Sequence, residues 1–397
     1  MINNMKMIKY EYKKIFTRPY CYGIILSIVI VCMIIPFFIV LQYKQRVSEF
    51  NDLNIGTLEE VYSRYNKSEL VEDGYEEILN ISSDGTDAIQ ELVANYYLDV
   101  YCSRLYRSTG KMQLIAMNEL VERPNEVMCI ETIKKKNDLI GREIDDTSYE
   151  ARDLKQQQEM MEQSKEAQFT DIGLWNKFNQ NETIAVFIFT FILIFAFSNI
   201  QQQEYRSNMY MILQNSINGK HKQIWMKCLS VYSVCIIGVL VINILLSIIY
   251  FGLGTTKGGQ VSLVNLDLIF SITPYDITIL EYAVYKMIFQ SVGLMTLILL
   301  EMVISIYAKS KFITALLTLI VLAIGELDSV INISGSNYFS LLGISKALNT
   351  REVFYRYRSF NIVGEPVLYP IVMMITMCSF ILFLSIFVIH KNYNSNS

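Results

Sequence analysis

Histidine is nearly missing from this chain, which has only His221 and His390 among its 397 residues. Hydrolytic sites of the Ser-His-Asp or Cys-His kind need a histidine to move protons, and neither histidine falls in a segment that we expect outside the cytoplasm. The seven cysteines are scattered and include no CxxC pair. We therefore expect no zinc or other metal site.

Nucleotide-binding motifs are missing as well. No GxxxxGK[ST] pattern occurs, because Gly219–Lys220 is followed by His221 and lacks the preceding glycine. The GxGxxG, GxSxG and HExxH patterns do not occur either. We expect no enzyme activity in this chain and no bound cofactor. The basic patches are short and lie beside apolar runs, so nucleic acid is not an expected partner.

What the sequence has in plenty is apolar residues, which make up 52% of the chain against 18% charged residues. The charge is divided unevenly. Residues 44–183 contain 28 acidic and 16 basic residues, a net charge of −12, and the remainder carries +8, which together give the net charge of −4. An acidic segment inside a basic, apolar frame suggests two environments.

Six apolar runs approach the length of about 20 residues that a membrane-spanning helix needs. We therefore predict an all-α polytopic membrane protein with six transmembrane helices. A proline, Pro36, is expected to kink the first of them. The predicted spans are residues 21–43, 184–200, 228–253, 287–307, 312–331 and 367–389.

Lysine and arginine in the short flanks set the orientation. Lys6, Lys9, Lys13, Lys14 and Arg18 place the amino terminus in the cytoplasm. Alternation then places residues 201–227 and the carboxyl terminus inside. The same alternation leaves residues 44–183, 254–285 and 332–366 outside, although 332–366 has four basic residues of its own. Residues 1–20 are amphipathic, which favours a helix in the inner membrane interface over an ordinary positively charged flank.

Residues 44–183 form the largest polar segment. Apolar residues three and four apart predict mostly helices there, among them one at 148–168 whose charged composition is typical of a solvated helix or a stalk. Cys102 and Cys129 both fall in this segment. They can form a disulfide if the segment is extracytoplasmic, but their spacing alone does not show it.

Residues 201–227, which we call the coupling segment, lie between two apolar runs. Tyr205, Met209, Ile212 and Leu213 share one helical face, and Asn218–Gly219 supplies a turn before a second short helix that leads into the third span. An amphipathic cytoplasmic segment of this kind suits contact with a partner protein. The alternative is an inert loop.

These residues carry a resemblance to a family. An apolar span, then Glu204-Tyr205-Arg206, an amphipathic helix, a turn and Lys227 before the next span resemble the transmembrane subunit of type-2 ATP-binding-cassette exporters. The resemblance covers the membrane part. It implies that Glu204 and the helix after it dock on a separate cassette ATPase, which binds ATP and Mg²⁺. Family members often have Gly-Thr where this chain has Asn208-Met209, which leaves the register of the coupling helix open.

Three carboxylates in the later spans are further candidates. Glu301 lies within the fourth span, where a charge is costly and usually faces protein or water. It is a candidate for the transport pathway, or a group hydrated near the inner interface. Glu326 and Asp328 sit near the end of the fifth span, where the resembled family has an outer gate. They are equally consistent with a simple helix end.

We therefore expect the permease subunit of an ATP-driven exporter in a cell membrane, as in bacteria. Its expected partners are cassette ATPase subunits, a second permease chain and the lipid bilayer. The alternative is a membrane-anchored receptor or scaffold that binds a peptide or a surface partner through its acidic extracytoplasmic domain.

Overall fold

The computed structural model describes the membrane part of the chain and one helix of the polar segment. The described residues are 30–51, 148–163, 172–206, 219–254, 257–267, 270, 273–308, 310–331, 343–355 and 357–394. The interfacial helix predicted for residues 1–20 and most of the predicted domain at 44–183 lie outside them.

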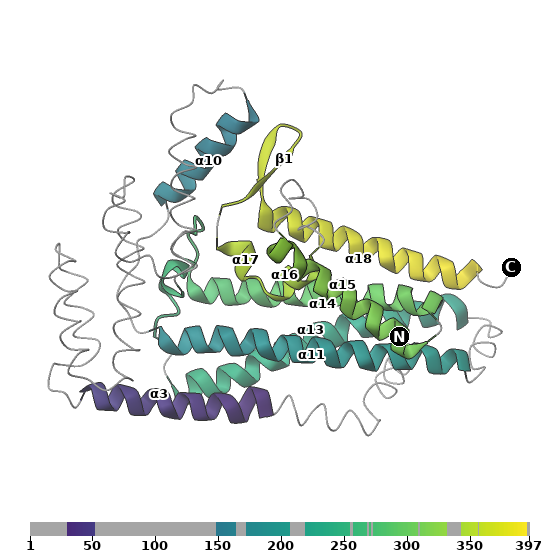
Figure 1. Ribbon diagram of the computed structural model, residues 1–397, viewed down its shortest axis with the longest axis horizontal. Coiled ribbons are helices and arrows are strands. Elements are labelled where there is room, and N and C mark those ends of the chain that lie inside the picture. Colours follow the sequence, from purple (N-terminus) through teal and green to yellow (C-terminus); the bar gives the residue numbers. More distant parts are fainter. Residues whose placement is uncertain are drawn as a thin grey trace.

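The described chain is a bundle of long helices whose axes lie roughly along one direction (Figure 1). These helices follow the apolar runs of the sequence, in which few residues would interrupt a helix. They are α3 (Ile35–Asn51), α11 (Gly173–Arg206), α13 (Gly219–Leu253), α14 (Ile279–Ala308), α15 (Lys311–Ile331) and α18 (Tyr369–Asn394).

Four of these helices are long and apolar enough to cross a membrane. Their candidate spans are Gly173–Ser198, Trp225–Leu253, Ile279–Ala308 and Tyr369–His390. Two further apolar stretches, Ile30–Gln45 and Lys311–Ala323, are shorter over the described residues. The prediction of a helical membrane protein is therefore confirmed, and the count of six spans stays a prediction.

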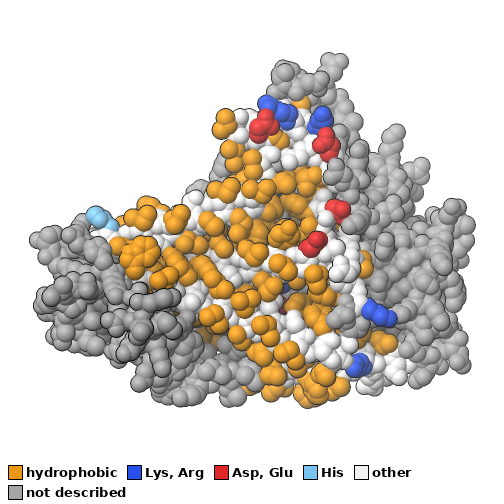
Figure 2. Space-filling model, turned by 180° about the vertical axis from the view of Figure 1, so that it is seen from behind, with side chains coloured by type: hydrophobic (Ala, Val, Ile, Leu, Met, Phe, Trp, Pro, Cys, Tyr) orange, Lys and Arg blue, Asp and Glu red, His pale blue; other side chains and the backbone are white. Residues whose placement is uncertain are grey.

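The surface agrees with a membrane-embedded bundle. Figure 2 shows a broad hydrophobic face across the long helices, with the acidic and basic side chains gathered near the end where α10 and β1 lie. Large apolar side chains on the long helices, such as Phe195, Leu382 and Ile386, are more than half exposed. In water such a face would be costly, whereas lipid solvates it.

The helices alternate in direction, as an up-and-down bundle requires. Near its start, α14 bonds to the start of α11, where the Lys286 ammonium donates to the Asn179 carbonyl. Near its end, α13 meets the same part of α11, because Asn243 approaches Glu182. We call the end at which α11 and α14 begin the hairpin end, and the end at which α11 stops and α13 begins the far end.

A π-helix, η1 (Ile30–Ile34), precedes α3. Pro36, the second residue of α3, has no N–H to donate to the carbonyl four residues back, which belongs to η1, and its ring crowds that carbonyl. A wider π-turn accommodates this loss. The kink expected at Pro36 therefore takes the form of a local change of helix type.

Short elements cover the hairpin end. They are η3 (Leu263–Asn265), α16 (Ile344–Leu348), α17 (Arg351–Phe354) and an antiparallel hairpin of β1 (Ser359–Ile362) and β2 (Glu365–Leu368). Val363 and Gly364 have φ of 54° and 88° and make the two-residue turn of this hairpin. The hairpin is a small departure from the all-α expectation.

The helix α10 (Tyr149–Gln163) falls within the predicted helix at 148–168 and rests against this hairpin. Tyr357 donates a hydrogen bond of 2.7 Å to the Asp153 carboxylate, and Arg152 pairs with Glu365 at 2.6 Å. Burial, and then the bond to Asp153, raise the pKa of Tyr357, so its hydroxyl stays a donor. The helix α10 is therefore docked by side chains rather than standing free as a stalk.

The helices α14 and α16 approach closely at Gly293. A Cβ atom at Gly293 would lie 2.8 Å from the Ala347 Cβ, closer than two carbon atoms can pack. Neither Cβ can turn away, because each is fixed to its own backbone. The position therefore requires glycine for the contact between these two helices.

We predict that Gly293→Ala lowers the free energy of unfolding by about 1–3 kcal/mol, the usual cost of overpacking. Gly252→Ala on α13 is the matched control, since a Cβ there meets nothing within 4 Å. That change should be neutral or slightly stabilising. Thermal unfolding in lipid nanodiscs measures both, and equal melting temperatures would contradict the described contact.

Candidate functional site

A buried ion pair joins α11 to α14 near the hairpin end. The Lys286 Nζ lies 2.6 Å from the Glu182 Oε2, and the two side chains are only 4% and 1% exposed. Lys286 also donates a 2.8 Å hydrogen bond to the Asn179 carbonyl, one turn before Glu182 on α11. Both charges of the pair lie inside helices that qualify as membrane spans.

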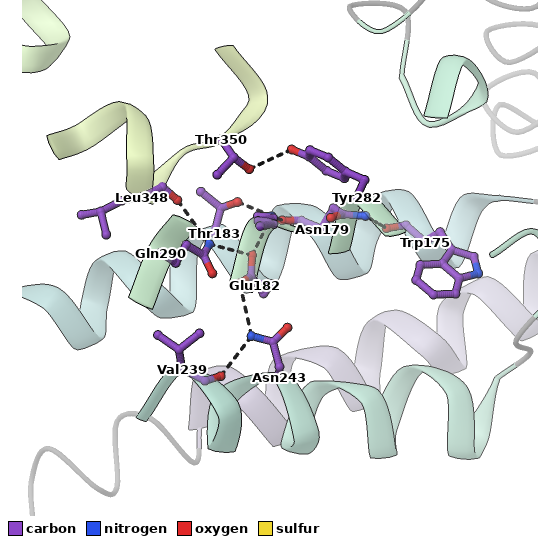
Figure 3. Close-up of polar contacts among 11 residues, drawn as sticks. Trp175, Asn179, Glu182, Thr183, Val239, Asn243, Tyr282, Gln290, Leu348 and Thr350 are labelled. Carbon is purple, nitrogen blue, oxygen red and sulfur yellow. Dashed lines mark hydrogen bonds and ion pairs between the residues drawn. The ribbon is translucent and has the colours of Figure 1, made fainter. Parts of the chain in front are cut away.

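Amide side chains complete the surroundings of the Glu182 carboxylate. Gln290 Nε2 donates to Glu182 Oε2 at 3.1 Å and to the Leu348 carbonyl at 3.2 Å. Asn243 Nδ2 donates to Glu182 Oε1 at 3.4 Å, which is a long bond, and to the Val239 carbonyl at 3.0 Å. Figure 3 shows Glu182 between Gln290 and Asn243, so the carboxylate ties α11 to both α14 and α13.

The sequence spacing explains this meeting of polar groups. Asn179 and Glu182 stand three residues apart on α11, and Lys286 and Gln290 stand four apart on α14. Residues at these spacings share one helix face. The two polar faces turn toward each other because each supplies the counter-charge and hydrogen-bond donors that the other needs once it is buried. Paired and hydrogen-bonded in this way, the charges can remain buried at tolerable cost.

A cavity of about 330 Å³ lies beside the ion pair. Lys286 and Asn179 form part of its wall, together with the loop before α14 and the start of α17. Its rim has a second ion pair, between Arg351 and Asp267. The full lining is Asn176, Asn179, Gln180, Thr183, Ile184, Leu266, Asp267, Phe270, Tyr282, Lys286, Asn349 and Arg351.

The lining of the cavity suits a small polar group. It carries two cations and one anion, so its own charge is +1, and most of its other polar side chains are amides or hydroxyls that can both donate and accept hydrogen bonds. The volume is at the low end for sites that hold small ligands. The wall is further fixed by Tyr282, whose hydroxyl lies 3.2 Å from that of Thr350.

Glu301, a sequence-predicted candidate, lies elsewhere. It is on α14, fifteen residues after Lys286, or about 22 Å along the helix. Its side chain is 1% exposed, and neither carboxylate oxygen has a hydrogen-bond partner in the described part of the chain. It does not line the cavity.

The coupling residues are placed only in part. Glu204, Tyr205 and Arg206 form the last residues of α11, and Lys227 lies on α13, which runs unbroken from Gly219 into its span. The side chains of the first three are outside the described residues. Met209, Ile212 and Leu213 lie outside them altogether, between the two helices.

The remaining candidates are also untested by contacts. Glu326 and Asp328 lie within α15, which ends at Ile331 as the predicted fifth span does, and their side chains are not described. Cys102 and Cys129 are outside the described residues. Among the described residues, no group of three or more histidine, cysteine, aspartate or glutamate side chains could hold a metal ion.

Sequence reasoning missed Glu182 and Lys286. Each stands just before a predicted span, at 184–200 and 287–307, and was assigned to the polar flank. The helix α11 begins at Gly173 and α14 at Ile279, so both residues lie inside longer helices. The signal was the pairing of polar residues three or four apart, Asn179 with Glu182 and Lys286 with Gln290, leading into apolar runs.

Comparison with models of protein families, with curated proteins and with solved structures finds no match for this chain.

We predict that Lys286→Met lowers the free energy of unfolding by about 3–5 kcal/mol, because it leaves Glu182 buried without its counterion. The double variant Glu182→Gln/Lys286→Met should recover most of this loss, since neither charge remains. Chemical unfolding of the protein in lipid nanodiscs measures both.

The exposed pair Arg152–Glu365 is the matched control, because its ions are also 2.6 Å apart but 42% and 65% exposed. Arg152→Ala should cost less than about 1 kcal/mol. If Lys286→Met costs no more than this control, the pair at Glu182 is not the buried constraint described above.

Proposed function

We propose that this chain is the permease subunit of an ATP-driven exporter of the type-2 ATP-binding-cassette kind, in a bacterial plasma membrane. In this proposal a separate ATPase binds ATP and Mg²⁺ and contacts the coupling segment. A second permease chain completes the pathway. The hairpin end and residues 44–183 face the outside, and both termini and the coupling segment face the cytoplasm.

One observation carries the proposal, namely that a single helix connects the polar cavity to the coupling segment. The helix α11 has 34 residues, or about 51 Å. Its first turns supply Asn176, Asn179 and Thr183 to the cavity, and its last residues are Glu204-Tyr205-Arg206. Because the hydrocarbon core is about 30 Å thick, such a helix projects from the membrane.

The ion pair couples a displacement of α11 to α14. A force on the last turns of α11 reaches the cavity without a loop in between, and the bond from Glu182 to Lys286 obliges α14 to move with α11. The cavity wall includes both helices and also the α16–α17 turn, which belongs to another part of the chain. Movement of α11 and α14 together against that turn would open or close the cavity, which is a rigid-body mechanism of alternating access.

The absence of nucleotide-binding motifs from the sequence supports a separate ATPase subunit. The full sequence has no phosphate-binding GxxxxGK[ST] loop. A permease without such a loop takes its energy through a contact, and the coupling segment is the cytoplasmic segment that best suits one. Glu326 and Asp328, near the outer end of α15 in this orientation, remain candidates for the gate.

A receptor or scaffold is the second candidate, and the docking of α10 on the hairpin favours it. Tyr149, Arg152 and Asp153 fix α10 to β1 and β2 by polar contacts, so a signal from the acidic segment could reach α18 directly. Such a protein would need no ATPase. Flux into inside-out vesicles separates the two functions, because only the exporter accumulates cargo in an ATP-dependent manner.

We predict that a cassette ATPase co-purifies with the full-length protein from its native membranes, and that Tyr205→Asp/Leu213→Asp reduces its yield by about tenfold or more. A charge on the predicted apolar face would remove an interface contact of the kind that dominates binding. Quantitative mass spectrometry of the purified complex measures the ratio of the two proteins.

Val363→Asn is the control, since Val363 lies at the hairpin tip, is 99% exposed and has a backbone conformation that asparagine tolerates well. It should leave the ratio unchanged. If no cassette ATPase is found with the wild-type protein, or if the double variant binds as well as the control, the permease assignment fails.

A further inference from the structure

Glu301 is a buried carboxyl group that neither the ion pair nor the cavity uses. It lies on the far-end half of α14, and both of its oxygens are sealed from solvent without a hydrogen-bond partner in the described part of the chain. The backbone of Ser198 on α11 lies beside it, but no bond with regular geometry forms. A carboxylate ion in such a place would have nothing to replace its hydration.

The hydroxyl groups of Ser305 and Ser198 do not offer Glu301 a proton. Ser305, one turn later on the same helix, donates to the Met302 carbonyl at 2.8 Å. Ser198 donates to the Phe195 carbonyl at 3.2 Å. Both serines are buried. Their oxygens can accept a hydrogen bond but have no proton left to donate, so the surroundings suit a group that carries its own proton.

No charged group of the described residues compensates Glu301 either. Within the described residues, the carboxyl group interacts with the Ser198 backbone and with no ionisable side chain. Among the described side chains, the titratable residues toward the far end of the neighbouring helices include Lys227, Cys228, Tyr232 and Cys235 on α13, Tyr307 on α14, Lys311 on α15 and His390 on α18. Glu301 interacts with none of them. Lys286 on its own helix is paired with Glu182.

Glu301 lies where the far-end halves of α11 and α14 pack against each other. Glu182 and Ser198 are sixteen residues apart on α11, and Lys286 and Glu301 are fifteen apart on α14. The two helices therefore run parallel in matched register over about 23 Å, with the ion pair at one contact and Glu301 at the other. From Ser198, α11 continues for about 12 Å to its end at Arg206.

We propose that Glu301 is a proton-binding site, which holds a proton while α11 and α14 are packed together and releases it when their far-end halves separate. Separation would let water reach the carboxyl group, and a hydrated carboxyl group ionises at neutral pH. The packed form then binds one proton more than the separated form. Each rise of one pH unit shifts the equilibrium about tenfold toward the separated form.

This inference does not need the exporter proposal, since it rests on the packing of α11 against α14. In an exporter it would make the transport cycle sensitive to pH at the cytoplasmic side. In a receptor it would make the same two helices respond to pH without any ATPase. Failure of the co-purification test would therefore leave it standing.

Infrared spectroscopy of the full-length protein in a detergent without ester or carboxyl groups tests the proposal, because a protonated carboxyl group has a carbonyl band that a carboxylate lacks. At pH 7 the wild-type protein should show this band, and Glu301→Gln should remove it. Glu281→Gln on the same helix is the matched control, because Glu281 is an exposed glutamate at the start of α14. That variant should keep the band.

The pH dependence of thermal unfolding is the second measurement. The wild-type melting temperature should fall between pH 6 and pH 9 more steeply than that of Glu301→Gln, whose amide stays neutral, and the Glu281→Gln variant should follow the wild type. A wild-type spectrum without the band at pH 7 overturns the proposal. So does a band or a melting temperature that follows sodium concentration rather than pH, since a bound cation would then occupy the site.

Discussion

The burial of the Glu182–Lys286 pair inside apolar helices is the constraint on which the arrangement of the bundle depends. Neither charge can be left alone in a medium without water, so α11 and α14 must keep the register that brings the two side chains to 2.6 Å. Asn243 and Gln290 extend the same requirement to α13 and, through the Leu348 carbonyl, to α16. Apolar packing alone would tolerate a helix that slid or rotated, whereas this network tolerates neither. It thereby fixes the wall of the cavity beside it.

Among the described residues, two buried carboxyl groups of the bundle differ in how their burial is compensated. The Glu182 carboxylate is surrounded by one cation and two amides. The polar cavity lies beside this ion pair. Glu301 has no counterion within the described residues, and its oxygens meet only the Ser198 backbone, without a hydrogen bond of regular geometry. A group of the first kind holds helices together at every pH at which both partners remain charged. A group of the second kind holds them together only while it keeps its proton. One contact between α11 and α14 is thus permanent and the other conditional.

The long apolar runs allowed the membrane helices to be predicted from sequence, because hydropathy over about 20 residues is a strong signal. The ends of the helices were harder to predict, because a charged residue beside an apolar run is normally hydrated. Glu182 and Lys286 differ from that expectation because they form an ion pair with each other. The pair depends on tertiary packing that neither segment reveals alone. The same holds for α10, whose polar composition suggested a solvated helix and whose polar side chains in fact bind Ser359 and Glu365 more than 200 residues away. Glu301 could be named from sequence because it interrupts an apolar run, but the surroundings of its carboxyl group could not be predicted.

The parallel helices α11 and α14 are joined by the ion pair at one contact and by protonated Glu301 at the other. This arrangement determines how a displacement of α11 is transmitted. If the far-end half of α11 is displaced, the ion pair acts as the pivot, because breaking it would expose two charges to an apolar medium. The displacement is then largest near Glu301 and the end of α11, and smallest at Glu182 itself. The cavity beside the pivot changes through rotation of the α11 and α14 walls against the α16–α17 turn, where Gly293 and Ala347 already stand in close contact. A close contact at that place limits sliding and favours rotation, so a small movement at the far end is converted into a change of shape at the cavity.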